Sequence, residues 1–310
     1  MLAGLVDDGT IGDLNEKVGT YIDWWTTDPT DARSEVTFRH LLSFTSGFGG
    51  GAPGAEGPSS HSCLDDDKGD FVACAQEIYK NVSLVGEPGK VYSYNSNHLQ
   101  LAGAIAMEAG KYKNIQEIVS KYLLLRYGMA NTTCGGGNTN PELAVCLQTT
   151  GADYERFLAA TEARTGLTSR TLYDESETNW TPFLDDDYTL YGNYGFGHFL
   201  ECYDSAAGFT SACKEAMVHC DPGAFGFYPL IDRNKGYYME VVAYEATAKF
   251  YPRSGIPEYL RFLVKPLVDA IMSGENVTET AGHHTPKFNG LGMAGVNYIV
   301  KCYVDPLSCL

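Results

Sequence analysis

The sequence predicts an α+β fold, with helices first, an antiparallel sheet after them and one long closing helix. Three observations support this prediction. Apolar residues recur at helical spacing in the first half of the chain, three strand-like runs lie between residues 194 and 246, and a strongly amphipathic stretch covers residues 258–272. Helices and strands that are grouped along the chain favour an α+β layout over a doubly wound one, in which they would alternate.

Five helices are expected in the first half of the chain. The first covers residues 37–44, because Thr37 can cap its start and Gly47 follows soon after its end. The other four are predicted by the spacing of their apolar residues, at 70–80, 97–109, 114–126 and 152–163. Between the first two helices, residues 47–70 are so rich in Gly, Ser and Asp that a surface loop is expected.

The predicted sheet is built from three runs that alternate or concentrate β-forming residues, at 194–202, 225–233 and 236–246. A tight turn at Asn234 and Lys235 is expected to join the last two as an antiparallel pair. The closing helix at 258–272 contains Pro266, which should kink it.

Charge and hydropathy exclude two classes of partner. The chain of 310 residues has a net charge of −17, and no basic cluster that could contact a phosphate backbone interrupts this excess. We therefore expect no nucleic-acid partner. No apolar run reaches the roughly 20 residues that a membrane-spanning helix requires, so no membrane span is expected.

Nine cysteines and four Asn-x-Ser/Thr sequons indicate a secretory route. The cysteines are spaced like local disulfides, as Cys63 with Cys74, Cys134 with Cys146, Cys202 with Cys213 or Cys220, and Cys302 with Cys309. The sequons are at Asn81, Asn131, Asn179 and Asn276. A secreted or lumenal location is the interpretation we favour, with a signal sequence expected outside this chain; the alternative is a cytosolic protein with reduced core cysteines.

Five stretches resemble, in the expected order, sequence blocks of the serine β-lactamase-like superfamily, which includes class C β-lactamases, related esterases and penicillin-binding peptidases. They are LVDDGTIGDLNEKVGTYI (5–22), VTFRHLLSFTSGFGG (36–50), GEPGKVYSYNSNHLQLAGAIAMEAGK (86–111), TTGADYERFLAAT (149–161) and HCDPGAFGFYPLIDRNKGYYMEVV (219–242). The resemblance implies a β-lactamase/transpeptidase-like domain over residues 1–272, with a helical region beside an antiparallel sheet and a C-terminal helix on that sheet. Residues 273–310, with two cysteines, are expected to be an extension.

The resemblance also implies a mechanism and a set of site residues. Enzymes of this superfamily acylate the serine of a Ser-x-x-Lys pair, a tyrosine of the second motif assists proton transfer, and a third-motif Lys or His aligns the substrate. Tyr94 occupies the tyrosine position. Ser96 stands where the family usually has Asn, and the neighbouring Asn97 is a weaker candidate for that role.

The third motif departs from the family pattern. His219 matches the cation, but Cys220, Asp221 and Pro222 follow it, and proline has no N–H to donate to an oxyanion. An alignment shifted by one residue would give that position to Gly223 instead. The sequence leaves both alignments open.

The nucleophile is expected outside this chain. In the family, the Ser-x-x-Lys helix and the first strands precede the block that here begins at Leu5, so we expect them upstream. The chain does contain Ser211-Ala212-Cys213-Lys214, but that segment lies just before the third motif, and we interpret it as a chance match.

Two functional hypotheses remain from these observations, and a third has less support. The first is a serine hydrolase acting on an ester, amide or peptide; the second is a catalytically inactive relative that binds a ligand or builds an assembly; the third is an unrelated cysteine-rich binding protein. No metal or organic cofactor is implied. The acidic run Asp65–Asp67 lacks the ligand spacing of a calcium site, and His283-His284 would point apart in an extended segment.

Overall fold

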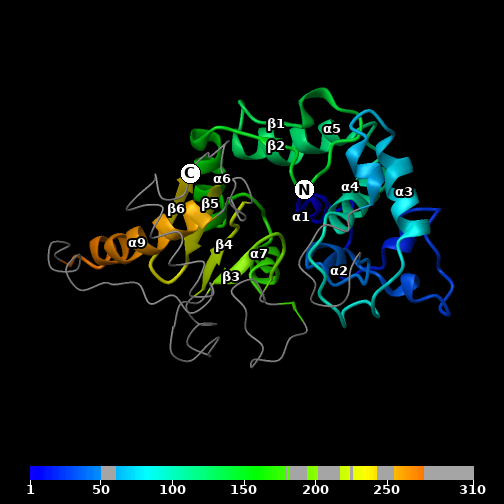
Figure 1. Cartoon of the computed structure of the whole chain (residues 1–310), viewed down its shortest axis with the longest axis horizontal. Coiled ribbons are helices and arrows are strands. Elements are labelled where there is room, and N and C mark those ends of the chain that lie inside the picture. The colour runs from blue at the N-terminus through cyan, green and yellow to red at the C-terminus, as the bar shows by residue number, and fades with distance from the viewer. Residues whose placement is uncertain are drawn as a thin grey trace, which may run out of the picture. The chain divides into compact units, whose positions relative to one another are not determined.

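The computed structural model describes residues 1–49, 61–178, 180–181, 194–201, 217–223, 226–242 and 255–275 (Figure 1). The chain divides into two compact units. Unit 1 comprises residues 1–182 and 194–197, and unit 2 comprises residues 183–193 and 198–310. Within the described ranges, no helix is both long and apolar enough to span a bilayer.

Unit 1 is mainly helical. Its α-helices are α1 (Leu2–Asp7), α2 (Phe38–Leu42), α3 (Phe71–Asn81), α4 (Asn97–Ala109), α5 (Ile115–Val119), α6 (Gly151–Glu162) and α7 (Arg170–Ser176). Short 3₁₀ turns lie at Val18–Thr20, Ala32–Glu35, Ser62–Asp65 and Gly135–Gly137, and a π-helix at Ser120–Leu125 continues α5. One small hairpin pairs β1 (Thr133–Cys134) with β2 (Leu147–Gln148).

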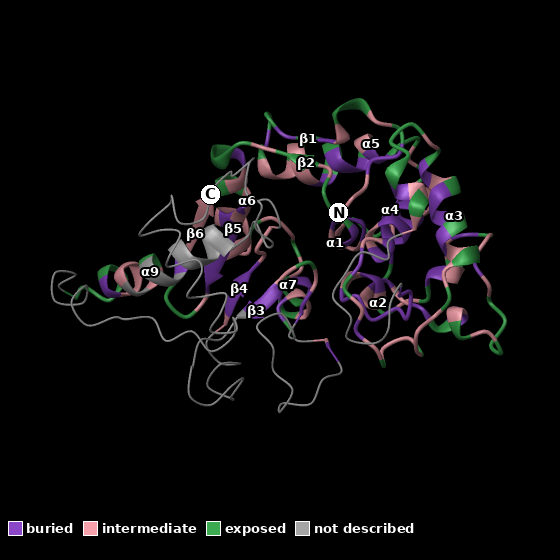
Figure 2. Cartoon of the chain, viewed as in Figure 1, coloured by how far each residue is buried: buried purple, intermediate pink, exposed green. Residues whose placement is uncertain are grey.

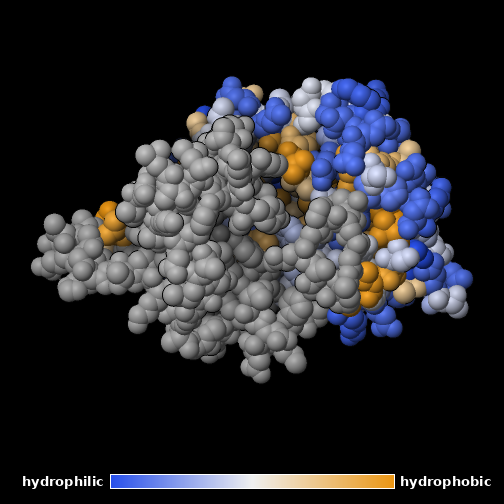
Figure 3. Space-filling view, viewed as in Figure 1, coloured by the Kyte–Doolittle hydropathy of each residue, from blue (hydrophilic) through white to orange (hydrophobic). Residues whose placement is uncertain are grey.

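Helix α4 forms the centre of unit 1. Ten of its thirteen residues are buried, and α2 and α3 pack against it (Figures 1 and 2). Gly103 permits this close packing, because a Cβ at that position would lie only 2.3 Å from Leu143 Cδ1 and 3.0 Å from Phe71 Cζ. The described surface on the visible face is mostly hydrophilic, with smaller apolar areas (Figure 3).

The expected helices of this unit are confirmed with small changes at their ends. Thr37 caps α2 by accepting a hydrogen bond from the His40 N–H, and His40 Nδ1 accepts one from the Thr37 N–H, so a histidine completes the capping box. Asp70 caps α3 in the same way, by accepting from the Ala73 N–H at 2.8 Å. Helix α7 was not predicted, and residues 62–65 of the expected loop form a 3₁₀ turn.

Two predicted disulfides are present, and both lie in unit 1. Cys63 pairs with Cys74, and Cys134 pairs with Cys146. The first bond ties the 3₁₀ turn at 62–65 to α3, and the second links β1 to the residue just before β2. Cys220 is buried on a strand of unit 2. The other four cysteines, Cys202, Cys213, Cys302 and Cys309, lie outside the described residues.

Unit 2 contains an antiparallel sheet of strand order β3-β4-β5-β6, as the predicted α+β class requires. The strands are β3 (Phe199–Glu201), β4 (Val218–Cys220), β5 (Phe227–Asp232) and β6 (Tyr237–Val242). The first predicted strand is shorter than expected, because it begins at Phe199 rather than residue 194. Strand β4 was missed, since three residues are too few to show the alternation that identifies a strand.

The turn between β5 and β6 corrects a prediction. Asp232 pairs with Tyr237, so four residues, 233–236, form the connection instead of a two-residue turn at Asn234 and Lys235. The Lys235 N–H donates to Asp232 Oδ1 at 3.0 Å, and Gly236 takes a positive φ of 64°. Glycine suits this position because it has no Cβ to clash in the left-handed region.

The closing helix is α9 (Gly255–Met272), which packs against β5 and β6. It continues through Pro266, and the predicted kink stays a prediction. Lys265 anchors the helix to the sheet, because its Nζ lies 2.7 Å from Asp232 Oδ2 on β5 and 3.0 Å from both oxygens of Asp269. Asp269 also accepts a hydrogen bond from the Tyr237 hydroxyl at 2.8 Å.

Candidate functional site

Tyr94 is the exposed member of an aromatic cluster in unit 1. It lies three residues before α4 and is 50% exposed, whereas the neighbouring Phe44 and Tyr194 are each 3% exposed. The Phe44 ring meets the Tyr94 ring edge to face with centroids 4.9 Å apart, and Tyr194 lies 5.9 Å from Tyr94. These two buried rings support one side of Tyr94, whose side chain is half-exposed.

Phe44 holds this cluster together from a strained backbone position. Its φ is 56°, in the left-handed region that bulky residues rarely adopt. The ring stacks on Tyr194 at 4.9 Å and also packs 5.1 Å from the His98 ring. Its carbonyl oxygen accepts a hydrogen bond of 2.9 Å from the Ser93 N–H. Sequence reasoning placed Phe44 at the end of a helix and gave no sign of this role.

Ser96 and Asn97, the other predicted second-motif residues, lie at the start of α4. Ser96 is the residue before α4, and its side chain makes no capping bond to the helix. Asn97 is fully buried, and its Oδ1 accepts a hydrogen bond from the His61 N–H at 2.9 Å. Asn95, which sequence reasoning did not select, donates from Nδ2 to the carbonyl oxygens of Phe48 and Ser93, both at 3.0 Å.

A second polar group, which the sequence did not predict, contacts the backbone next to Tyr94. Ser46 Oγ lies 2.8 Å from His98 Nδ1, and His98 Nε2 lies 2.8 Å from the carbonyl oxygen of Ser93. Both side chains are fully buried. Burial lowers the pKa of His98 to about 3, so its imidazole is neutral. Each residue stands in a block that resembles the β-lactamase-like superfamily, but their contact spans 52 positions and no local pattern indicates it.

His219, the predicted third-motif cation, lies in unit 2 on the internal strand β4. It pairs with Leu200 on β3 and Ile231 on β5, and it is 5% exposed. The His198 ring stands edge-on to it with centroids 5.0 Å apart. Burial raises the pKa of the nearby Asp221 to about 7.

Gly223, the alternative oxyanion residue, already uses its backbone N–H. That group donates to the carbonyl oxygen of Phe227 at 2.6 Å, and the Asp221 N–H donates to Pro229 at 3.3 Å. Because Pro222 has no N–H, residues 221–223 offer no unengaged backbone donor while these bonds are made. If Gly223 takes the oxyanion position, its backbone donor is therefore occupied in this structure.

The predicted residues fall in different units, Tyr94 in unit 1 and His219 with Gly223 in unit 2. Ser211, Lys214 and the pair His283-His284 lie outside the described residues.

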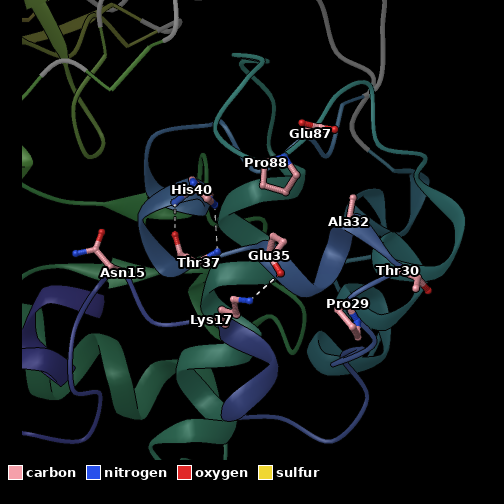
Figure 4. A pocket seen from close by; sticks show the side chains of 10 residues that line it. All are labelled: Asn15, Lys17, Pro29, Thr30, Ala32, Glu35, Thr37, His40, Glu87 and Pro88. Carbon is pink, nitrogen blue, oxygen red and sulfur yellow. Dashed lines mark hydrogen bonds and ion pairs between the residues drawn. The ribbon is translucent and has the colours of Figure 1, made fainter.

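A separate polar pocket lies around the start of α2 in unit 1 (Figure 4). The side chains that line it are those of Asn15, Lys17, Pro29, Thr30, Ala32, Glu35, Thr37, His40, Glu87 and Pro88. Lys17 and Glu35 form an ion pair of 2.7 Å, and Thr37 and His40 are engaged in the cap of α2. None of the predicted site residues lines this pocket.

One group of potential metal ligands occurs among the described residues, His61, Cys63 and Glu77, whose ligand atoms lie within 4.8 Å of one another. Two of these atoms are already engaged. Cys63 Sγ is in a disulfide, and His61 Nδ1 accepts a hydrogen bond from the Cys63 N–H at 3.2 Å. The group does not fit a metal, because a thiolate is required for cysteine to act as a ligand.

Comparison with known proteins identifies a family. The family model named Beta-lactamase matches residues 1–244. None of the curated proteins matches the chain.

Several solved structures have a similar fold. A putative β-lactamase from Bacteroides dorei is 23% identical with a TM-score of 0.59, over 84% of this chain and 80% of that one. The octameric penicillin-binding protein homologue from Pyrococcus abyssi is 16% identical with a TM-score of 0.60, over 90% of this chain but only 64% of that one. A β-lactamase/D-alanine carboxypeptidase from Yersinia pestis, in complex with citrate, is 17% identical with a TM-score of 0.56, over 84% of this chain and 78% of that one. At these sequence identities, the structural similarity shows that this chain shares their fold.

Proposed function

Because the chain belongs to the Beta-lactamase family, whose model spans residues 1–244, we propose that it is a serine hydrolase that cleaves an ester, amide or peptide bond through an acyl-enzyme. Within unit 1, the half-exposed Tyr94 supports this proposal most directly. Its hydroxyl is presented by two buried rings, and a phenol in this position can move a proton between nucleophile, substrate and leaving group. His219 is the proposed cation that aligns the substrate.

The nucleophile of this proposal is the serine of a Ser-x-x-Lys helix N-terminal to Leu5, because the family blocks in this chain follow the order in which that helix comes first. The adjacent lysine would accept the serine proton as the acyl bond forms. An ester or peptide substrate is favoured over a β-lactam. The basis for this preference is His219, since related esterases often carry histidine at that position.

Ester hydrolysis by the natural full-length protein tests this proposal. We expect Tyr94→Phe to lower kcat by about 10²- to 10⁴-fold, the usual contribution of a positioned proton-transfer group. Tyr194→Phe is the matched control, because it removes a hydroxyl from a buried ring of the same cluster. Equal activity of Tyr94→Phe and wild type would remove Tyr94 from the mechanism.

A second candidate function is a catalytically inactive member of the family that binds a ligand or builds an assembly. The observation that favours it is the engagement of the Gly223 N–H by Phe227 together with the proline at 222. Losing one oxyanion donor costs about 3 to 4 kcal/mol of transition-state stabilisation. The octameric state of the Pyrococcus abyssi neighbour is the basis for expecting self-assembly in this case. Light scattering that shows an oligomer, with no turnover of any ester or peptide, would favour this function.

We also propose that the protein is secreted and carries N-linked glycans. In the described part of the chain, Asn81 and Asn131 are exposed, and so are the hydroxyl residues of their sequons, Ser83 and Thr133. The two disulfides of unit 1 agree with an oxidising compartment. Endoglycosidase treatment of the natural protein should reduce its mass, and Asn81→Gln and Asn131→Gln should each remove one increment. An unchanged mass would argue against the secretory route.

A further inference from the structure

Ser46, His98 and the Ser93 carbonyl, next to Tyr94, form one continuous series of hydrogen bonds. It runs from Ser46 Oγ to His98 Nδ1 and from His98 Nε2 to the Ser93 carbonyl oxygen, each step being 2.8 Å. That carbonyl belongs to the peptide bond that joins Ser93 to Tyr94. A buried helix residue is therefore linked directly to the backbone that carries the proposed catalytic phenol.

The direction of each hydrogen bond follows from the last acceptor. A backbone carbonyl can only accept, so His98 Nε2 must carry a hydrogen and donate it to Ser93. The neutral ring then has a bare lone pair on Nδ1, which accepts the hydrogen of the Ser46 hydroxyl. Burial, which lowers the pKa of His98 to about 3, keeps the ring neutral at neutral pH, and the Ser93 carbonyl selects this tautomer.

The hydrogen bonds resemble those of a serine nucleophile and its general base, because a hydroxyl faces an imidazole whose other nitrogen is oriented by a third group. Two observations argue against that chemistry. Ser46 and His98 are both fully buried, so a substrate cannot reach the hydroxyl. A base with a pKa near 3 is also far below the operating pH at which proton transfer is efficient. The pair is better suited to hold a structure than to attack a bond.

The backbone around this peptide is held by other hydrogen bonds as well. Asn95 Nδ2 donates to the Ser93 and Phe48 carbonyl oxygens, and the Ser93 N–H donates to the carbonyl oxygen of Phe44. Phe44, with its positive φ, supplies the ring that meets Tyr94 edge to face. The residues on both sides of Tyr94 are thus fixed, while its side chain remains half-exposed.

We propose that His98, whose Nε2–H tautomer is set by the Ser93 carbonyl and whose Nδ1 accepts from Ser46, is a positioning residue that fixes the Ser93–Tyr94 peptide and so sets where the Tyr94 hydroxyl points. The inference rests on the proposed function in one respect, since Tyr94 must act in the reaction for its position to affect the rate. Neither Ser46 nor His98 touches the substrate. Misplacing a catalytic group by about 1 Å costs about 100-fold in rate.

Two substitutions of His98 by an amide side chain each keep one of its two hydrogen bonds and remove the other. The Gln side chain reaches as far as Nε2 of histidine, so His98→Gln can still donate to the Ser93 carbonyl while losing the Ser46 contact. The Asn side chain reaches only as far as Nδ1, so His98→Asn can still accept from Ser46 while losing Ser93. Both variants replace a buried imidazole with an amide, and Asn, which is one methylene shorter than Gln, leaves the larger cavity.

The readout is the NMR signal of the Tyr94 ring in the full-length protein labelled with ¹³C-tyrosine and assigned through Tyr94→Phe. We expect His98→Asn to shift or broaden this signal and His98→Gln to leave it close to wild type. In ester hydrolysis, His98→Asn should lower kcat about 10- to 100-fold with little change in KM. Asn140→Ala is the control, because it breaks another buried contact of α4, the 2.8 Å bond from Gln100, away from Tyr94.

Equal shifts of the Tyr94 signal in His98→Asn, His98→Gln and Asn140→Ala would overturn the proposal, and so would no shift in His98→Asn. A measurement on the unmodified protein guards against variants that do not fold. ¹⁵N spectra of the histidines should show His98 neutral with its hydrogen on Nε2 at pH 7, and an Nδ1–H or charged ring would contradict the inference. Because the NMR signals need no turnover, they decide this proposal even if the protein hydrolyses nothing.

Discussion

The buried imidazole of His98 makes the stability of unit 1 depend on pH. Its pKa is about 3 in the folded chain because of burial, whereas histidine in an unfolded chain titrates near 6.5. Between these values the unfolded state binds the extra proton, so the free energy of unfolding rises with pH. The stability that neutral His98 contributes is complete above about pH 6.5 and is lost as the pH falls toward 3.

We therefore predict that the free energy of unfolding of unit 1 falls by about 1 kcal/mol per pH unit between pH 6 and pH 5. All three tryptophans of the chain, Trp24, Trp25 and Trp180, lie in unit 1, so tryptophan fluorescence during urea unfolding reports on this unit. His98→Gln should flatten most of the slope. Burial also lowers the pKa of His40, which leaves a smaller slope of the same sign. A wild-type slope of zero in this window would contradict the buried neutral ring.

Lys265 provides a prediction for unit 2. Its side chain is 12% exposed and that of Asp232 is 3% exposed, so Lys265→Met would leave a buried carboxylate without its cation. We expect a loss of about 3 kcal/mol, seen as faster amide hydrogen exchange in residues 227–242. Lys17→Met is the matched control, because the side chains of the Lys17–Glu35 pair are about half exposed and solvent screens their attraction, so its loss should be much smaller. Similar losses in the two variants would count against this account of α9 docking.

At the residue scale, the sequence predicted what depends on near neighbours. Thr37 was identified as a helix cap and Tyr94 as a motif tyrosine because the evidence for each lies within a few positions. The contact of Ser46 with His98 and the stack of Phe44 on Tyr194 join residues 52 and 150 positions apart. Such contacts are made when the loop after α2 packs against α4 and against Tyr194, and no sequence periodicity indicates them.

At the scale of elements, the loop after α2 depends on one glycine. Gly47 has a φ of 88°, and a Cβ there would lie 2.5 Å from the carbonyl oxygen of Gly86. Gly9 has a similar φ of 76° but nothing within 4 Å, so it isolates the backbone cost from the clash. This loop carries Phe44, which contacts Tyr94, and Ser46, which contacts His98, so its conformation is part of the candidate site.

We predict that Gly9→Ala costs about 1 to 2 kcal/mol, the penalty for an L residue in the left-handed region. Gly47→Ala should cost at least about 2 kcal/mol more, because a backbone atom must move away from the new methyl group. Urea unfolding followed by tryptophan fluorescence measures both. Equal losses would show that the loop adjusts freely around Gly47.

Helices were easier to predict than strands in this chain, and the reason is length. Helices α3, α4 and α6 have eleven to thirteen residues, enough to repeat an apolar pattern several times. Strand β4 has three residues, so its alternation is too brief to identify it, and β3, also of three residues, was predicted to begin too early. The four-residue turn after β5 was missed because its geometry depends on the Asp232 side chain and on Gly236 rather than on the two residues expected at its tip.

For the whole molecule, the fold and the family agree. A helical unit 1, an antiparallel sheet with a long helix in unit 2 and a family match over residues 1–244 all correspond to the class expected from five short blocks. The predicted division at residue 272 stays a prediction. The chemistry could be predicted only in part, because an oxyanion site depends on which N–H groups remain unengaged, and the bond from Gly223 to Phe227 is visible only in the structure.

The central claim, that this family member acts through an acyl-serine assisted by Tyr94, is tested most directly by the mass of the natural full-length protein after treatment with an alkyl fluorophosphonate. We predict one adduct per molecule on the serine of a Ser-x-x-Lys segment, forming at least about 100-fold more slowly in Tyr94→Phe. An unchanged mass, under conditions that fully label a known serine hydrolase, would contradict the claim and favour a protein of this family that binds or assembles without catalysis.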